Sequence, residues 1–588
     1  MAGSKLCIDR NYKPAIVMKR NRLFLLVLLL WSARFPVAAQ QYCVVIDEIM
    51  ADPGPQVGLP NYEWIELKNI SSFPIELLGW KLADASTISG PMPQFVLQPD
   101  SFVVVCSSNA AAGLAIFGPT ITVTNFPSLD NSGDQLSLKD AIGKTIHGLS
   151  YDISWYQNEL KKEGGWTLEM IDPDNPCSGS SNWIASISST GGTPGHENSV
   201  NNPNSDRLSP QLKRAYAIDE LTIVLVFDEP VDSMKSADYQ NYVVDGGLAI
   251  DSAACIAPVF DKVRLKLAGP MQTGIIYTVA ANNITDCKNN SIGSLNKTRF
   301  GLSIEAGDSD IVINEILFNP RPGGFDYVEF YNSSNKIFDV SHLYIANRNS
   351  SGTISSITRL STIPWLLFPG DYIVTTEDAA SLAREYFVKN PDAIFIVPSL
   401  PSFPDDKGYV VLLNLQGHVI DEVDYFDDWH FKLIANDEGV ALERIDPKSP
   451  SEHPGNWHSA GSTAGYGTPG YKNSQYRQPG PALAKIDVMP VMFSPDNDGI
   501  DDFATIQYKT DVPGYMANII IFDAAGRAVR NLVRNEMLAI MGSWNWDGLD
   551  DKGRKLPVGN YIVFTELFRL DGQKSKFKNI VVLARRMN

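Results

Sequence analysis

The chain has 588 residues, with 49 Lys and Arg against 67 Asp and Glu, which gives a formal net charge of −18. This acidic balance argues against a nucleic-acid-binding protein, because binding to a phosphate backbone requires a basic face. Hydrophobic residues make up 44% of the chain, enough for several buried cores, and the length suggests about three to five domains.

The N-terminus has the layout of a secretory signal peptide. Basic residues precede the apolar run Leu23–Trp31, and small residues just before Gln40 provide a cleavage site. Met18, followed directly by two basic residues, is typical of a signal-peptide start and favours translation from that residue. Nine apolar residues reach only about 14 Å as a helix, short of the roughly 30 Å bilayer core. The sequence therefore predicts a signal peptide at 1–39 and no transmembrane span in the mature chain.

The mature chain contains an internal duplication. Residues 45–49 (VIDEI) return as residues 312–316 (VINEI), and residues 64–69 (WIELKN) return as residues 327–332 (YVEFYN). Both copies end with Leu-Glu-x-Ile-Asp-Pro, then Asn-Trp, Thr-Pro-Gly and Asn-Ser. Alternating and continuous apolar runs bounded by turn residues predict β-sandwiches. A single helix is expected over residues 377–387, where apolar side chains keep helical spacing.

Both copies resemble the lamin tail domain, an Ig-like β-sandwich. The resemblance rests on the opening Ile-x-Glu-Ile, the Trp-Ile-Glu-Leu-x-Asn strand, and the closing Asn-Trp and Thr-Pro-Gly-x-x-Asn-Ser. It implies a first copy at residues 40–200 and a second copy at residues 308–475. The family occurs in nuclear lamins and in exported bacterial proteins, and the signal peptide favours the exported kind.

A different module is expected between the copies. Residues 201–209 are rich in Asn, Pro and Ser and predict a linker. Residues 210–304, the middle module, contain strand-like runs such as 221–227. Their Pro-Val, Asn-Tyr and Tyr-Thr-Val motifs resemble the small Ig-like modules of bacterial surface-layer proteins.

Export makes disulfides possible among the five cysteines of the mature chain. Cys255 and Cys287 both fall in the middle module and are therefore the preferred pair. The odd number leaves at least one thiol unpaired or joined to another chain. No C-x-x-C motif occurs, so the sequence does not favour a redox or zinc site.

After a predicted linker at 476–483, the C-terminal module covers residues 484–588. Its signatures at 493–502 and 546–553 resemble the Ig-like domain of the flagellar hook-capping protein and the C-terminal domain of gliding-bacteria surface proteins. In the second family this domain is a sorting signal for type IX secretion. The resemblance therefore implies an outer-membrane secretion or anchoring machinery as a partner.

Asp496, Asp498 and Asp502 are the predicted metal ligands. Closely spaced carboxylates around Gly499 suit a hard, oxygen-binding ion, so a structural Ca²⁺ ion is the expected cofactor. The loop departs from the EF-hand, since Ile500 replaces a ligand and no Glu closes the loop. The alternative is a solvated acidic turn that caps a strand.

Two further groups of side chains have both a functional and a structural interpretation. The pairs Glu48 with Glu66 and Glu315 with Glu329 could supply an acid and a base, or they could form structural hydrogen bonds or lie on an exposed strand face. Four tryptophans could either form a glycan-binding platform or lie buried in the cores of the sandwiches. They are Trp155, Trp166, Trp365 and Trp429.

Together these features predict an all-β chain of four Ig-like β-sandwiches in tandem after a signal peptide. No catalytic motif emerges, so the expected function is a non-enzymatic secreted or cell-surface protein with a structural, adhesive or ligand-display role. Surface glycans or other surface proteins are the expected ligands. The alternatives are a carbohydrate-binding accessory protein of an extracellular hydrolase system and a hydrolase with an unrecognised carboxylate site.

Overall fold

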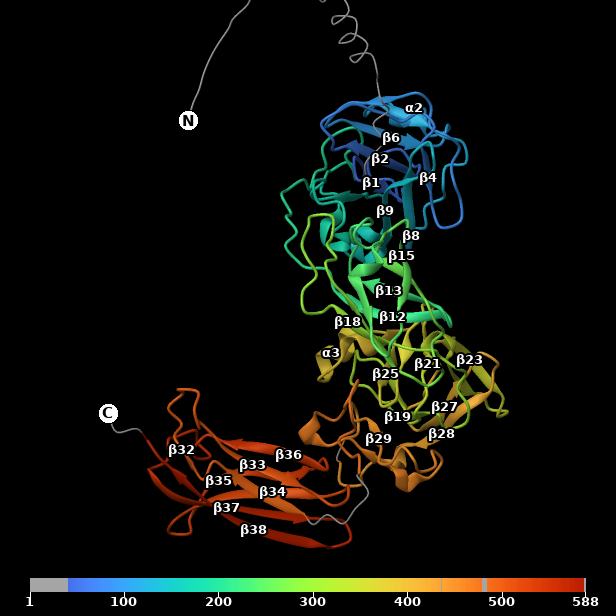
Figure 1. The fold of residues 1–588 in the computed structure, drawn as a ribbon. Helices are drawn as coiled ribbons and strands as arrows, with labels where there is room; N and C mark the ends of the chain where they lie inside the picture. The colour runs from blue at the N-terminus through green and yellow to red at the C-terminus, as the bar shows by residue number, and fades with distance from the viewer. Residues whose placement is uncertain (1–40, 435, 478–483, 586–588) are drawn as a thin grey trace, which may run out of the picture. The chain divides into compact units, whose positions relative to one another are not determined.

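The structure is a computed structural model that describes residues 41–434, 436–477 and 484–585. The predicted signal peptide and most of the linker predicted at 476–483 lie outside these residues. Most of the regular secondary structure in the described chain is β-strand, as predicted (Figure 1). None of its helices is long and apolar enough to cross a bilayer. It divides into two compact units, of which the first ends at Arg207 and also includes Ala257–Phe260, and the second holds the rest.

The first copy folds into a β-sandwich. Its strands are β1 (Val44–Met50), β2 (Trp64–Asn69), β3 (Ile75–Glu76), β4 (Lys81–Ala83), β5 (Val96–Leu97), β6 (Phe102–Cys106), β7 (Thr120–Thr122), β8 (Gly133–Lys139), β9 (Thr145–Asp152), β10 (Leu168–Met170) and β11 (Trp183–Ala185). One sheet has the order β11-β10-β1-β2-β6-β7, in which only β6 and β7 run parallel. The facing sheet is β4-β8-β9, and β3 pairs with β5.

The second copy repeats this arrangement. Its strands are β19 (Ile311–Leu317), β20 (Tyr327–Asn332), β21 (Phe338–Asp339), β22 (Tyr344–Arg348), β23 (Ile354–Arg359), β24 (Leu366–Leu367), β25 (Tyr372–Thr376), β26 (Ile394–Ile396), β27 (Lys407–Leu413), β28 (Val419–Phe426), β29 (Leu442–Arg444) and β30 (Trp457–Ser459). The six-stranded sheet has the order β26-β25-β20-β19-β29-β30, again with a single parallel pair, β25 with β26. The facing sheet is β23-β22-β27-β28. The duplicated sequence thus forms the same sheet twice.

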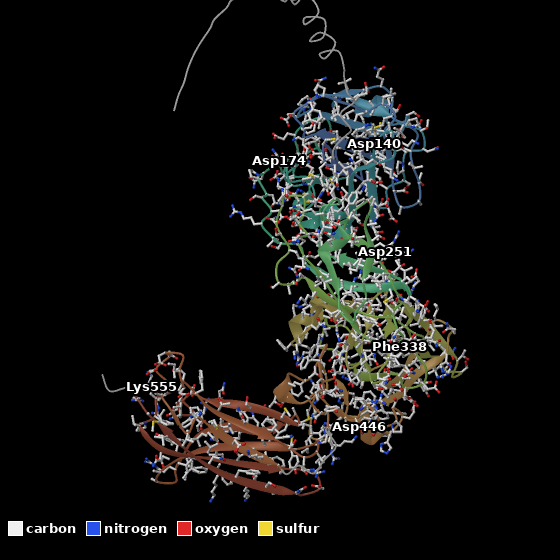
Figure 2. All side chains as sticks on the ribbon, in the orientation of Figure 1. Asp140, Asp174, Asp251, Phe338, Asp446 and Lys555 are labelled. Carbon is white, nitrogen blue, oxygen red and sulfur yellow. The ribbon has the colours of Figure 1, made fainter. Side chains whose placement is uncertain are left out.

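Apolar residues at every second position build the cores of both sandwiches. In the first copy Ile65 and Leu67 of β2 and Val103 and Val105 of β6 have 0% exposure and pack in one cluster. The second copy has a matching cluster that includes Phe338, labelled in Figure 2. Hydrogen bonds between residues close in sequence stabilise the hairpin turns. The carboxylate of Asp140, labelled in Figure 2, closes the β8–β9 turn. It accepts hydrogen bonds from the N–H groups of Ile142 (3.0 Å) and Lys144 (2.8 Å).

The middle module has two small sheets. Its strands are β12 (Leu212–Asp219), β13 (Thr222–Phe227), β14 (Tyr242–Val244), β15 (Ile250–Ile256), β16 (Lys262–Leu267), β17 (Tyr277–Ala281) and β18 (Lys297–Phe300), paired as β12-β13-β16-β15 and β14-β17-β18. Within the second unit its core is continuous with the second copy, because Ile337, Leu366 and Phe368 belong to the same buried cluster.

The C-terminal module is a second kind of sandwich. Its strands are β31 (Lys485–Met489), β32 (Met492–Phe493), β33 (Ala504–Lys509), β34 (Met516–Asp523), β35 (Ala528–Met537), β36 (Met541–Trp546), β37 (Gly559–Phe568) and β38 (Lys574–Leu583). They pair as β31-β33-β36 and β32-β38-β37-β34-β35. Met516 and Met537 of this module pack against Phe431 of the second copy.

Helices are few and short. The predicted helix is present as α3 (Ala379–Glu385), and its first turn is capped by Asp378, whose carboxylate accepts from the N–H groups of Ala380 and Ser381. The other α-helix among the described residues is α2 (Ala111–Leu114).

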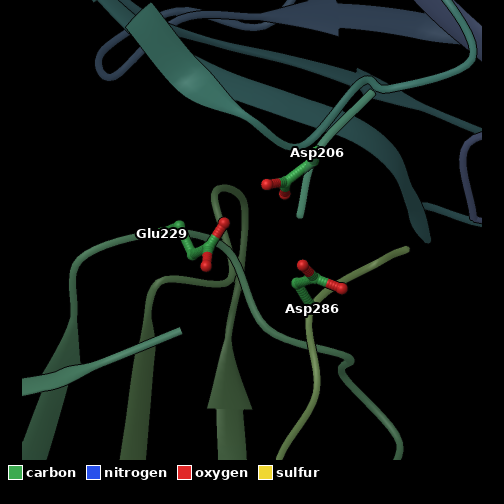
Figure 3. Close-up of side chains that lie close together, drawn as sticks. All are labelled: Asp206, Glu229 and Asp286. Carbon is green, nitrogen blue, oxygen red and sulfur yellow. The ribbon is translucent and has the colours of Figure 1, made fainter. Parts of the chain in front are cut away.

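The structure corrects the expected Cys255–Cys287 disulfide. Cys287 is disulfide-bonded, whereas Cys255 keeps its thiol. Cys255 belongs to β15 in one sheet of the middle module, while Cys287 follows β17 of the other sheet. The Cys287 loop is shaped by Asp286, whose side chain is labelled in Figure 3. Its carboxylate accepts from the N–H groups of Lys288 and Asn290. Shared module membership was therefore too weak a guide to pairing.

Candidate functional site

The predicted calcium loop joins β32 to β33. Asp496 and Asp498 are exposed, Asp502 is half-buried, and one oxygen of each lies within 4.8 Å of the others. The Asp502 carboxylate accepts hydrogen bonds from the N–H groups of Asn497 (2.6 Å) and Gly499 (2.9 Å), which curls the loop around it. Gly499 has φ +84°, a conformation that favours glycine. The spacing noted in the sequence does bring the three carboxylates together.

Calcium binding at this loop stays a prediction. Two exposed carboxylates and a half-buried one suit Ca²⁺, which takes six to eight oxygen ligands. An ion that binds only the folded chain at 100 times its Kd adds about 2.7 kcal/mol of stability. We therefore expect Ca²⁺ to raise the melting temperature of the C-terminal module, and the paired change Asp496→Asn with Asp498→Asn to abolish the rise.

The matched control for that titration is Asp571→Asn. Asp571 is also a turn aspartate of the same module, where its carboxylate accepts from the N–H of Gln573 (3.0 Å). This variant should respond to Ca²⁺ like the parent chain. If Ca²⁺ gives the parent chain neither a heat of binding nor a change in melting temperature, the loop does not bind Ca²⁺.

Three glutamates lie side by side on the other face of the six-stranded sheet, away from the main core of the first copy. Glu48 of β1 is the register partner of both Glu66 of β2 and Glu169 of β10. Each of the three residues is 0% exposed. Alternation within an antiparallel strand usually places such polar residues in water, so another part of the chain must cover them.

The cover is the closing segment, which we define as residues 193–200 in the first copy and residues 468–475 in the second. In the first copy the N–H of Thr193 donates to Glu48 Oε1 (2.8 Å) and the N–H of Gly195 to Glu66 Oε2 (2.5 Å). The Thr-Pro-Gly motif therefore supplies backbone donors to two buried carboxyl groups.

The Asn-Ser motif completes the attachment. The Ser199 hydroxyl donates to Glu169 Oε2 (2.7 Å), and the N–H of Val200 donates to the same oxygen (3.1 Å). The Asn198 amide donates to the backbone carbonyls of Asp47 (3.0 Å) and Met170 (2.9 Å), on two neighbouring strands. The motifs at the two ends of the copy are thus parts of one hydrogen-bonded network.

The second copy has the same network. Glu315, Glu329 and Glu443 are its buried glutamates, each 0% exposed. The N–H of Thr468 donates to Glu315 Oε1 (2.8 Å), and the N–H of Gly470 donates to Glu329 Oε2 (2.7 Å). Because the closing segment donates to the matching glutamates in both copies, this attachment is a feature that the two copies share.

Burial also sets the protonation of these groups. Burial and the neighbouring Glu443 carboxyl together raise the pKa of Glu315 to about 8. The geometry agrees, because Thr468 Oγ1 lies 2.9 Å from Glu315 Oε2 and 2.9 Å from Glu443 Oε1. A hydroxyl has one hydrogen to donate, so one of these carboxyl groups must donate its own proton to Thr468.

These contacts settle what the glutamate pairs do. Glu48 with Glu66 and Glu315 with Glu329 bind the closing segments, and their full burial leaves no face of either pair open to a substrate. The structural hydrogen-bond interpretation of the sequence is confirmed, and the exposed-face interpretation is wrong. Acid and base catalysis by these pairs has no support in the geometry.

Residues 38–152 match the family model of the Lamin Tail Domain. The matched range covers the opening strands of the first copy and ends before the closing segment. The chain has no significant match among curated proteins.

Solved structures give low overall similarity. The N-terminal part of the bacterial S-layer protein SbsC is 15% identical over 28% of this chain and 40% of its own, with a TM-score of 0.15. A longer SbsC chain is 12% identical over 65% and 55%, with a TM-score of 0.16. A DUF4876 family protein from Bacteroides thetaiotaomicron VPI-5482 is 14% identical over 40% and 86%, with a TM-score of 0.17. The matches to SbsC therefore span about half or less of those chains.

The four tryptophans do not form an exposed platform. Trp155 and Trp166 pack on the core of the first copy, and Trp365 and Trp429 pack on that of the second copy. Trp429, for example, stacks on Trp457 with ring centroids 6.3 Å apart. Trp155 is buried, and the other three are half-buried against these cores, which favours the core interpretation over an exposed platform.

A cavity of about 270 Å³ lies where the middle module meets the second copy, within the second unit. Arg214, Arg299 and Asp371 are among its lining residues. The Arg299 guanidinium is 2.8 Å from Asp371 Oδ2, and Arg214 donates to the backbone carbonyl of Pro364. Because these groups already bind one another or the backbone, the cavity offers an incoming ligand few uncommitted charges.

Sequence reasoning missed one buried charged pair. Arg444 of β29 lies 3.1 Å from Asp421 of β28, and the two side chains are 2% and 7% exposed. The first copy has Met170 and His147 at the third positions of the matching strands β10 and β9. An arginine in a strand that is otherwise apolar on that face was the available signal.

Proposed function

We propose that this protein is a non-enzymatic, exported cell-surface protein whose β-sandwich modules serve a structural, adhesive or ligand-display role. The observation that supports the proposal most directly is that the buried glutamates bind the closing segments. The carboxyl groups best placed for acid–base chemistry hold the closing segments in place and are shielded from solvent.

Two further features support this role. The chain strings together sandwich modules with many short surface loops, which is where binding residues concentrate on rigid scaffolds. The signal-peptide pattern at the N-terminus supports export. In this proposal the C-terminal module directs secretion or anchoring at the outer surface, by a type IX route.

The test is surface display in cells that express the full chain. A short epitope is inserted at Ile142, which is 87% exposed in the β8–β9 turn. We expect antibody to label intact cells that make the full chain, and externally added protease to remove the label. A variant that lacks residues 484–588 should be exported across the inner membrane and then remain inaccessible to antibody.

Full-length protein found only in the cytoplasm would contradict the export proposal. Equal surface labelling of the truncated chain would remove the sorting role of the C-terminal module and leave the display role intact. Strong binding to insoluble polysaccharide would favour the carbohydrate-binding accessory role instead.

A further inference from the structure

Among the buried differences between the two copies, one lies at the bulge next to the glutamates. Each opening strand carries a β-bulge, between Ile46 and Glu48 in β1 and between Ile313 and Glu315 in β19. A bulge turns its extra residue out of the regular alternation. That extra residue is Asp47 in the first copy and Asn314 in the second, with 1% and 3% exposure.

In the second copy the bulge residue supplies two hydrogens. Asn314 Nδ2 donates to Glu329 Oε1 (2.7 Å) and to Asn473 Oδ1 (2.6 Å). Asn473 is held in turn by its own amide, which donates to the backbone carbonyls of Asn314 (2.8 Å) and Arg444 (2.9 Å). Both side-chain acceptors that face the Asn314 amide therefore have a donor.

In the first copy the same place brings only acceptors together. Both Asp47 carboxyl oxygens, Glu66 Oε1 and Asn198 Oδ1 are buried without a hydrogen-bond partner among the described residues. The Asn198 amide cannot turn around, because its Nδ2 already donates to two backbone carbonyls. Glu66 Oε2 is likewise occupied by the N–H of Gly195. A buried acceptor without a donor costs about 1–3 kcal/mol.

We propose that the first copy holds a buried proton on the Asp47 carboxyl group, donated to Glu66 Oε1 in place of the Asn314 amide hydrogen of the second copy. One acid proton replaces two amide hydrogens, so the first copy is the less fully hydrogen-bonded of the two. The network that binds the closing segment of the first copy then includes a hydrogen bond, from Asp47 to Glu66, that is lost when the pH rises and the proton dissociates.

The surroundings favour the protonated acid. Burial raises the pKa of Asp47 to about 7, against an ordinary value of 3.8. Lys68 of β2 opposes the shift, and nearby carboxylates add to it. The titratable groups that face this position are Glu48 on β1, Glu66 and Lys68 on β2, Asp100 before β6, His147 on β9, Glu169 on β10 and Glu197 in the closing segment.

The direction of the pH effect follows from linkage. The Asp47 pKa is higher in the folded chain than in the unfolded chain, so stability from this group is complete below about pH 4 and is lost as the pH rises to about 7. Each pH unit in that window lowers the folding constant by up to about tenfold. Burial also raises the pKa of Glu66, so only when both carboxyl groups are ionised do Asp47 and Glu66 face each other with no hydrogen between them.

The test compares both copies in one molecule. Hydrogen exchange of the mature chain, corrected for intrinsic rates, reports amide protection of residues 193–200 and 468–475 at pH 4, 5.5, 7 and 8.5. We expect protection of residues 193–200 to fall more steeply with pH. Asp47→Asn should raise it at least tenfold at pH 8.5, change it little at pH 4, and leave residues 468–475 unaffected.

The reciprocal change provides the second arm. Asn314→Asp should give residues 468–475 the steeper pH dependence that the parent shows at residues 193–200. An infrared band of a protonated carboxyl group should also be present in the parent at pH 5.5 and weaker in Asp47→Asn.

Several outcomes would overturn the proposal. Lower protection in Asp47→Asn at every pH, or its failure to fold, would mean that an ionised Asp47 is required. Loss of protection on adding a chelator would assign the four oxygens to a bound cation. Parallel pH profiles for the two closing segments would remove the distinction between Asp47 and Asn314.

Discussion

Replacing Asp421 by Ala should destabilise the second copy by about 3–5 kcal/mol, because it leaves a buried guanidinium without its counter-ion. Arg444 Nη1 binds Asp421 Oδ2 (3.1 Å) and the backbone carbonyl of Ile313 (2.9 Å) inside the sandwich. Asp421 Oδ2 is also the acceptor for the N–H of Ile313 at the bulge (2.8 Å). The change therefore leaves the buried Arg444 guanidinium without its counter-ion and the N–H of Ile313 without its acceptor. Urea unfolding, monitored by hydrogen exchange in residues 442–459, measures the loss in the free energy of unfolding.

The first copy supplies the control for this prediction. There His147 Nδ1 accepts from the N–H of Ile46 (2.8 Å), and Met170 takes the place of the arginine. The double change Asp421→His with Arg444→Met should therefore recover most of the lost stability and lie within about 1–2 kcal/mol of the parent. Equal destabilisation by the single and double changes would show that the ion pair is not the cause.

The second copy should also lose stability as the pH rises from about 4.5 to about 8. Burial raises the pKa of Glu315 from 4.5 to about 8, so the folded chain holds a proton that the unfolded chain releases. Stability from a group with a raised pKa is complete below the unfolded value and is lost as the pH passes the folded value. A shift of this size corresponds to a loss of a few kcal/mol. Thermal unfolding across this range measures the slope.

Glu315→Gln and Glu315→Ala separate charge from hydrogen bonding. In the Gln variant Oε1 can accept from Tyr327 and the N–H of Thr468, as Glu315 Oε1 does now (2.6 and 2.8 Å), and the amide can donate to Thr468 Oγ1. We expect Gln to flatten the pH dependence with little loss at pH 5. Ala should cost about 3–5 kcal/mol at every pH, because it leaves buried donors unsatisfied. A Gln variant as pH-sensitive as the parent would show that another group carries the proton.

Much of the fold could be predicted because its signals are local. The alternation at residues 64–67 and the repeated opening and closing motifs identified β-strands and a duplication, and both copies do form the same six-stranded sheet. Helix α3 could be predicted because its apolar residues keep helical spacing within one short stretch of chain. The turn around Gly499 likewise brought the predicted aspartates together.

The glutamate network could be predicted only in part. Glu48 and Glu66 sit at strand positions that the alternation alone would place in solvent, and nothing local shows that residues 193–200 cover them. The cover arrives from 129 residues away in the case of Glu66 and Gly195. The Cys255–Cys287 pairing failed for a related reason, since being in one module does not place two residues on facing loops.

The late position of the closing segment has a consequence for how the chain comes to be made. Any polypeptide that emerges N-terminus first, from a ribosome or through a membrane channel, delivers β1 and β2 long before residue 193. Until that point the three glutamates of the first copy remain in water, where they ionise and keep the partial sheet soluble. A nascent chain interrupted after β10 would lack the closing segment and would remain accessible to proteases and chaperones. Only the addition of residues 193–200 would complete the domain.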